Sequence, residues 1–331
     1  MKNLYKMMFL VTLMFSTLIT LSSSSWIGMW LGMEINLLSI IPLMSSQNPM
    51  SSEASMKYFI IQALASSVLL VSIIMALTNS LTFKNKETLL IYSALMTKMG
   101  AAPFHYWFPE IMEGLTWTNC LIMMTWQKIA PLTLTLYTST TKILSTMVII
   151  SSLMIGGIQG LNQTSLRKLM AFSSVNHLGW MISLTLLNNS MWATYLGIYT
   201  LMSSSIVYSL ASNKILFMKQ LAMKMSKPHK ITLTMNFMSM SGMPPFIGFF
   251  PKWITINMLM NNNLALLSFI MTMLTLITMF LYIRLTMSMF TISLNNTNIM
   301  KMPSSLNNFP MITSLLINIS LPIYTLNISL T

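Results

Sequence analysis

About eleven runs of mostly apolar residues, each roughly 20 residues long, follow one another along this chain of 331 residues. A helix of that length spans the hydrocarbon core of a bilayer. Only 7% of the residues are charged, against about 25% in a soluble domain. The sequence therefore predicts an all-α, polytopic membrane protein with a single transmembrane domain, 1–331. The predicted spans are 7–23, 26–44, 57–78, 88–108, 117–138, 143–160, 167–187, 190–213, 231–258, 263–290 and 309–327.

The few charges are distributed unevenly between the two sides of this predicted bundle. The chain has five Glu, no Asp and a net charge of +13. The basic residues are spread thinly between apolar runs, which argues against a nucleic-acid partner. When the spans alternate across the membrane, twelve of the 18 Lys and Arg fall on the side of the N-terminus and three on the other side. This positive-inside bias predicts the N-terminus inside and the C-terminus outside.

Several classes of site are excluded by residue type. The single cysteine, Cys120, allows neither a disulfide within the chain nor a four-cysteine iron–sulfur cluster. No glycine-rich phosphate loop and no HExxH pattern occurs. We therefore expect no NADH, ATP or zinc site in this chain. The 38 methionines are interpreted as flexible apolar packing and not as a copper site.

Two segments, 98–107 and 242–253, share a pattern of Gly, Pro-Phe, Lys and Trp within one predicted span. The first contains Pro103, and the second contains Pro244 and Pro245. Broken helices at corresponding places in two halves of a chain are typical of transporters built from inverted repeats. The pattern predicts two broken helices, and these prolines as residues that support the functional site.

Four ionisable residues lie well inside predicted spans: Glu34, Lys98, Lys128 and Lys252. A charge near the bilayer centre costs roughly 2.5–3.5 kcal/mol, so each must be hydrated, paired or used. Lys252 lies nearer the end of its span, and there snorkelling to the interface is an alternative. For Glu34 beside a lysine, the alternative is a static buried salt bridge that stabilises little.

Buried lysines are suited to carrying protons. An apolar environment favours the neutral amine, so such a lysine can load and release a proton near neutral pH, and a nearby carboxylate shifts that balance back. His177, midway along its span, is a further candidate because imidazole titrates near neutrality, and simple packing is the alternative for it. His105 is either a supporting proton carrier or a residue that fixes the chain locally. Ligation of a haem by these two histidines is the less favoured alternative.

Six stretches of the sequence resemble the subunit 2 family of animal mitochondrial NADH dehydrogenase. Their residues are most similar to those of arthropod members. They occur in the same order as in that family, between about residues 26 and 255, whereas the remainder matches only in hydropathy. The matching stretches are 30–38 (WLGMEINLL), 53–59 (EASMKYF), 98–107 (KMGAAPFHYW), 126–131 (WQKIAP), 161–168 (LNQTSLRK) with 176–180 (NHLGW), and 244–249 (PPFIGF) with 252–253 (KW).

The resemblance implies an antiporter-like fold with two inverted five-helix bundles. The first, 26–160, would contain Glu34, Lys98 and Lys128. The second, 161–290, would contain the broken helix at Pro244–Lys252, and 291–331 would form a C-terminal helix. In the family a Glu–Lys pair, a central Lys and a Lys on the second broken helix form the proton axis. The matching motifs assign these roles to Glu34, Lys98, Lys128 and Lys252. His177 is added to this set because of its place in the middle of a predicted span.

The resemblance also implies a function: a core membrane-arm subunit of respiratory complex I that couples NADH oxidation by ubiquinone to proton translocation. FMN, iron–sulfur clusters, NADH and ubiquinone would bind to other subunits. The expected partners are other membrane-arm subunits, accessory subunits and lipids, cardiolipin among them. The expected location is the mitochondrial inner membrane, with the N-terminus in the matrix and the C-terminus in the intermembrane space. The alternative is a stand-alone cation/proton antiporter of the same fold.

Overall fold

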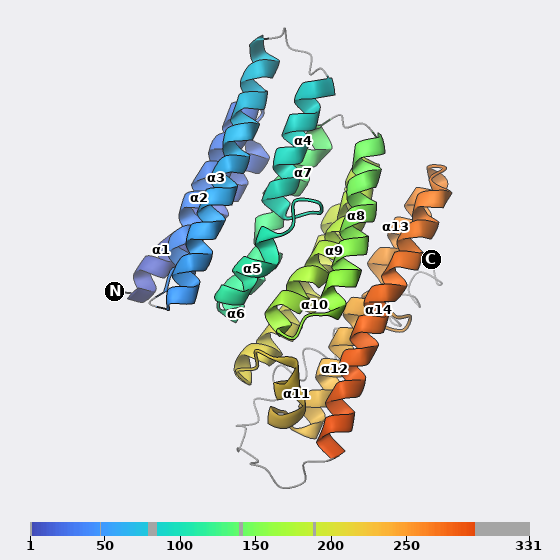
Figure 1. Ribbon diagram of the computed structural model, residues 1–331. Coiled ribbons are helices and arrows are strands. Elements are labelled where there is room, and N and C mark those ends of the chain that lie inside the picture. Colours follow the sequence, from blue (N-terminus) through green and yellow to red (C-terminus); the bar gives the residue numbers. More distant parts are fainter. Residues whose placement is uncertain (1, 47, 79–84, 139–141, 188–189, 295–331) are drawn as a thin grey trace, which may run out of the picture. The chain divides into compact units, whose positions relative to one another are not determined.

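The chain is built from α-helices. The computed structural model describes residues 2–46, 48–78, 85–138, 142–187 and 190–294 (Figure 1). Within these ranges the extended structure is limited to an isolated antiparallel bridge between Ser165 and Phe217. The chain divides into two compact units, residues 1–152 and 153–331, and the second is described as far as residue 294.

The helices of the first unit account for the predicted spans up to residue 138. They are α1 (Lys2–Ser22), α2 (Trp26–Met44), α3 (Pro49–Thr78), α4 (Asn85–Met99), α5 (Trp107–Gly114), α6 (Trp117–Met124), the 3₁₀ turn η1 (Trp126–Lys128) and α7 (Ile129–Tyr137). The boundary between the units falls inside α8 (Lys142–Leu161). The second unit continues with α9 (Leu166–Leu186), α10 (Met191–Ser212), α11 (Met218–Lys224), α12 (Lys227–Ser241), α13 (Phe249–Asn261) and α14 (Ala265–Leu294).

Each predicted span up to residue 290 coincides with one helix or with consecutive shorter helices. Five helices, α1, α2, α3, α8 and α14, are individually long and apolar enough to cross a membrane by length and composition. The short α11 was not predicted, and it lies in the basic stretch 213–230. The predicted span 309–327 lies outside the described residues, and so does most of the predicted C-terminal region 291–331.

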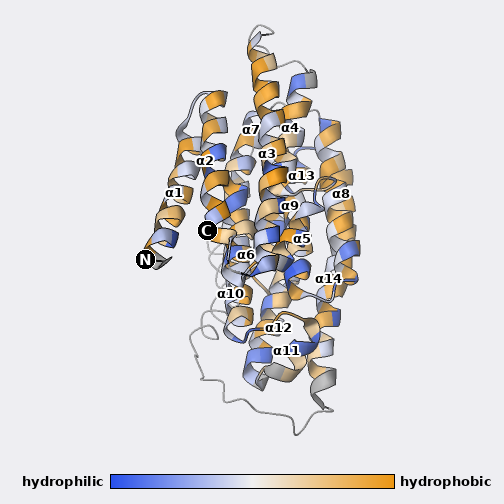
Figure 2. Ribbon diagram, turned by 60° about the vertical axis from the view of Figure 1, so that its left-hand side comes forward, coloured by the Kyte–Doolittle hydropathy of each residue, from blue (hydrophilic) through white to orange (hydrophobic). Residues whose placement is uncertain are grey.

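Large apolar side chains cover much of the accessible surface. Leu4, Phe15, Leu64, Leu266 and Phe269 are each at least 60% exposed, and Figure 2 shows hydrophobic residues along most of the ribbon. In water, contiguous apolar surface of this kind would drive association. Lipid chains solvate it without that cost, which agrees with a membrane protein.

Both predicted broken helices are present, and in each the first half-helix ends in the same way. α4 is followed by Gly100 with φ 71°, and α12 by Gly242 with φ 79°. In each case the amide of that glycine bonds back three residues and the next amide bonds back five residues. This is the Schellman ending, which needs a left-handed residue that glycine adopts without strain. The chain then crosses a short loop before α5 or α13 begins.

A third interruption lies near Pro131, a residue that is expected to kink its helix. The span 117–138 divides into α6, η1 and α7. The Thr125 hydroxyl donates to the carbonyl of Leu121 at 2.7 Å, and Pro131 has no amide hydrogen to bond the carbonyl of Gln127 four residues earlier. The α-helix is therefore interrupted at Trp126–Lys128 by a tighter 3₁₀ turn, which brings Lys128 to a break as well.

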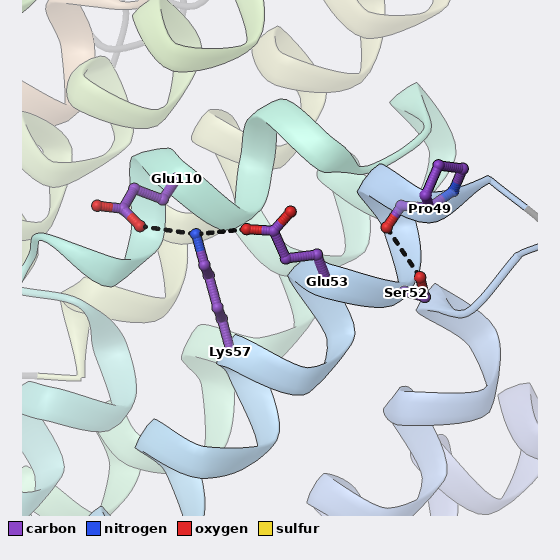
Figure 3. A network of polar contacts seen from close by, with 5 residues as sticks. All are labelled: Pro49, Ser52, Glu53, Lys57 and Glu110. Carbon is purple, nitrogen blue, oxygen red and sulfur yellow. Dashed lines mark hydrogen bonds and ion pairs between the residues drawn. The ribbon is translucent and has the colours of Figure 1, made fainter.

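A surface ion cluster joins the start of α3 to α5. Lys57 lies between Glu53 at 3.0 Å and Glu110 at 3.3 Å (Figure 3). All three side chains are exposed, so the stabilisation is small and sensitive to salt. The contact places the start of one predicted span and the end of the next on one side of the first unit, in agreement with alternating spans.

Candidate functional site

Lys98 lies in the last turn of α4 and is 8% exposed. Its carbonyl accepts a hydrogen bond from Gln62 Nε2 on α3 at 3.4 Å. Glu34, half-buried on α2, is close enough for its carboxylate to attract the Lys98 ammonium. No direct ion pair joins these two described residues. The static buried salt bridge considered from the sequence is therefore not formed, and the charges interact across a gap.

A polar cavity of about 20 Å³ adjoins Lys98, room for about one water molecule. Its polar lining comes from four elements, and Met33, Leu37, Ala130 and Pro131 complete the wall. The polar lining residues are Asn36, Tyr58, Gln62, Lys98 and Gln127. A cavity of this size with several hydrogen-bonding groups suits a water molecule next to the Lys98 amine.

A short chain of hydrogen bonds links three of the polar residues that line this cavity. Gln127 donates from Nε2 to Asn36 Oδ1 at 2.8 Å, and the Tyr58 hydroxyl donates to Gln127 Oε1 at 3.5 Å. Sequence analysis missed these residues because it selected ionisable groups only. The available signal was uncharged amides in the middle of apolar runs, where an unpartnered amide is costly.

Lys128 is the last residue of η1 and is 1% exposed. Its Nζ lies 5.7 Å from the centre of the Phe108 ring, within reach of a cation–π attraction. Its neighbour in the chain, Gln127, lines the cavity beside Lys98. The 3₁₀ turn therefore places Lys128 next to a polar segment inside the unit.

Lys252 lies in the first turns of α13 and is 6% exposed. Its Nζ donates a hydrogen bond to the carbonyl of Ser241, at the end of α12, at 2.7 Å. The ring of Trp180 on α9 is 5.9 Å from the same atom. The side chain is thus turned inward across the break, and the snorkelling alternative for this lysine is wrong.

His177 lies on α9, whose residues are almost all buried. The ring is 3% exposed, and its Nδ1 is 2.9 Å from the hydroxyl of Tyr195 on α10. The ring of Tyr199, one turn further along α10, is 4.9 Å away. These contacts were not anticipated from the sequence.

His105 and the three prolines lie in the loops at the two breaks. His105 is completely buried, with Nδ1 3.3 Å from the carbonyl of Pro103, and its own carbonyl accepts the amide of Phe108 at the start of α5. Those contacts favour the interpretation that His105 fixes the loop. Pro244 and Pro245 lie between α12 and α13, where a missing amide hydrogen interrupts no helical bond.

Each unit therefore places at least one buried lysine where a helix is interrupted, with a further ionisable residue inside an unbroken helix. Glu34, Lys98 and Lys128 belong to the first unit, and His177 and Lys252 belong to the second. Such groups can take up and release protons without any cofactor, because an amine or imidazole carries the proton itself.

Comparison with known proteins gives a consistent assignment. Residues 23–278 match the family described as NADH:quinone oxidoreductase/Mrp antiporter, TM. The chain is 46% identical over 326 residues to NADH-ubiquinone oxidoreductase chain 2 of Anopheles gambiae, across 96% of this chain and 95% of that protein.

Two solved structures show the same fold. A chain of respiratory complex I from Thermus thermophilus has a TM-score of 0.84 at 18% identity, over 96% of this chain and 77% of that chain. A chain of the Mrp complex from Dietzia sp. has a TM-score of 0.76 at 16% identity, over 84% of this chain and 59% of that chain. The protein therefore belongs to the NADH:quinone oxidoreductase/Mrp antiporter transmembrane family, among the relatives of NADH-ubiquinone oxidoreductase chain 2.

Proposed function

We propose that this chain is a core membrane-arm subunit of NADH:ubiquinone oxidoreductase, a proton-translocating enzyme. It couples electron transfer, carried out in other subunits, to proton movement through its buried lysines. The observation that carries the proposal is the placement of Lys98, Lys128 and Lys252 at helix interruptions, each less than 9% exposed. The 46% identity to a chain 2 protein favours this role over a stand-alone cation/proton antiporter, which shares only the fold.

The mechanism is electrostatic. Quinone reduction elsewhere in the complex perturbs the interaction of Glu34 with Lys98. A change in that interaction alters the proton affinity of Lys98, and Lys128 and Lys252 then change their proton occupancy in turn. Each charge moved against 100 mV requires about 2.3 kcal/mol, so the steps depend on coupling to the redox reaction.

The same proposal covers location and partners. The chain lies in the mitochondrial inner membrane, with its N-terminus in the matrix and its C-terminus in the intermembrane space. Other membrane-arm and accessory subunits surround it, and FMN, iron–sulfur clusters, NADH and ubiquinone bind elsewhere in the complex. The basic stretch between α10 and α12 contributes to cardiolipin binding through exposed lysines such as Lys214 and Lys219. Lys230, by contrast, is buried and donates to the carbonyl of Ala222.

Replacement of Lys128 by Met tests the function directly, because bulk is retained and the charge is removed. We expect NADH-driven ubiquinone reduction and proton uptake into sealed vesicles to fall together in the assembled complex. Lys142→Met, at an exposed position at the start of α8, is the matched control and should leave both rates unchanged. Unchanged rates in Lys128→Met would show that this lysine is structural.

A further inference from the structure

A column of buried polar side chains runs along one face of α9 towards Lys252. Ser174, His177 and Trp180 follow one another at intervals of three residues, which places them on one side of a helix. None is more than 3% exposed. Trp180 is the end nearer to Lys252, since its ring is 5.9 Å from Lys252 Nζ. The column therefore leads from the lysine at the break towards the N-terminal end of α9.

Two tyrosines of α10 lie against this column. Tyr195 and Tyr199, four residues apart, are 1% and 0% exposed. The Tyr195 hydroxyl is 2.9 Å from His177 Nδ1, and the Tyr199 hydroxyl lies beside that of Ser174. Ser174 donates its own hydrogen to the carbonyl of Ala171 at 2.7 Å.

Packing alone does not require hydroxyl groups here. Phenylalanine fills nearly the same volume as tyrosine, and burying a hydroxyl in an apolar medium is costly unless it is bonded. Tyr282 of α14, 2% exposed, brings another hydroxyl near Ser173, and this hydroxyl has no hydrogen-bond partner among the described residues. Hydroxyl and imidazole groups can each donate and accept, which is the property that a chain of proton transfers needs.

The indole N–H of Trp180 indicates that a water molecule binds at the end of the column nearer to Lys252. Its Nε1 is buried and has no hydrogen-bond acceptor among the described residues. A buried donor of this kind is normally satisfied, and ordered water is a common partner. A water molecule accepting from Trp180 would also be next to the amine of Lys252, one helical turn from His177.

We propose that Tyr195, Tyr199 and His177 form the proton relay by which Lys252 gains and loses its proton. The inference rests on the proposed function of Lys252 and names the route that serves it. The imidazole takes up a proton on one ring nitrogen and releases one from the other, while each hydroxyl accepts a proton as it gives up its own. Only O–H and N–H bonds are made and broken, and no electron is transferred.

Two ionisable side chains contact the His177 ring, Tyr195 and Tyr199 on α10. Lys252 on α13 lies against Trp180, and Tyr282 on α14 lies near Ser173. Residues 153–161 of α8 contain no titratable side chain, and the sequence after Glu113 contains no Asp or Glu. No carboxylate of this unit's side chains therefore competes for the proton on this route.

Tyr195→Phe tests the relay in the assembled complex, since it removes one hydroxyl and keeps the ring. Tyr208→Phe is the control, because Tyr208 lies on the same helix and is 49% exposed. We expect Tyr195→Phe to lower proton uptake and NADH-driven ubiquinone reduction about tenfold. We also expect a larger ratio of the rates in H₂O and D₂O, because a slowed proton transfer becomes rate-limiting. A purely structural effect would leave that ratio unchanged.

Lys252→Met separates failure of the relay from failure of the function. If Lys252→Met lowers the rates while Tyr195→Phe matches Tyr208→Phe in rate and isotope ratio, the relay is wrong and the function stands. If Lys252→Met also leaves the rates unchanged, the proposed function fails for this unit. Should Tyr195→Phe prevent assembly, Tyr199→Phe is measured in the same way, and an unaltered isotope ratio there overturns the relay.

Discussion

The two broken helices use one backbone device and place their lysines on opposite sides of it. Both α4 and α12 end at a glycine with positive φ and the same pair of hydrogen bonds. Lys98 precedes its break, on the last turn of the first half-helix. Lys252 follows its break and reaches back to the carbonyl of Ser241. Equivalent breaks therefore do not imply equivalent lysines.

The countercharges differ as well. Lys98 has the carboxylate of Glu34 nearby, whereas the sequence after Glu113 offers no acidic side chain. Lys252 is held instead by the C-terminal end of α12, where unpaired carbonyls carry a partial negative charge. A carboxylate can itself be neutralised, but a helix end cannot. The first lysine therefore responds to a charged side chain, and the second responds to the geometry of its break.

The largest effect is expected from Gly248→Ala, which tests whether the second break depends on close backbone contact. A Cβ at Gly248 would overlap the carbonyl oxygen of Ser239 near the end of α12. Overpacking of a rigid backbone contact costs about 3 kcal/mol or more, so we expect little assembled complex. Gly197→Ala is the control, because a Cβ there meets nothing within 4 Å. The measurement is the amount of complex on a native gel, and normal assembly of Gly248→Ala would contradict this packing.

A smaller effect is expected from Gly242→Ala, and comparison with Gly100→Ala isolates the role of the lysine. Both changes force a non-glycine residue into the left-handed region, at a cost of roughly 1–2 kcal/mol. At Gly242 the added Cβ would also lie 2.7 Å from Lys252 Nζ. At Gly100 the nearest atoms belong to Phe108 and Trp107, each at 3.2 Å.

We therefore expect both variants to lose thermal stability by a similar amount, and Gly242→Ala to lose more proton uptake per assembled complex. The measurements are a thermal unfolding curve and proton uptake in sealed vesicles. Equal proton uptake in the two variants would show that the contact between Gly242 and Lys252 does not affect proton translocation.

Much of this comparison could be predicted from the sequence. The features that could not be predicted depend on the contacts of individual side chains. Apolar length located the helices, and the Gly–Pro–Phe pattern located both breaks. The contact of Lys252 with Ser241 could not be predicted, because it depends on how α13 returns past the end of α12. The interruption at Trp126–Lys128 depends on a side-chain hydrogen bond of Thr125 in addition to Pro131. Partners such as Tyr195 for His177 join different helices, and hydropathy does not report which helix faces align.

Glu34→Gln gives the smallest of these effects and tests the claim that the first lysine depends on a charged neighbour. The change keeps the shape of the side chain and removes its charge, so the attraction on Lys98 across the gap is lost. We expect the coupled rates to fall by roughly tenfold, the factor that corresponds to about 1.4 kcal/mol of lost interaction, while the complex still assembles. Glu53→Gln, an exposed carboxylate on α3, is the control and should change the rates little. If the two variants behave alike, Glu34 does not set the charge on Lys98. The first break would then resemble the second, where no carboxylate of the same unit faces the lysine and a backbone carbonyl holds it.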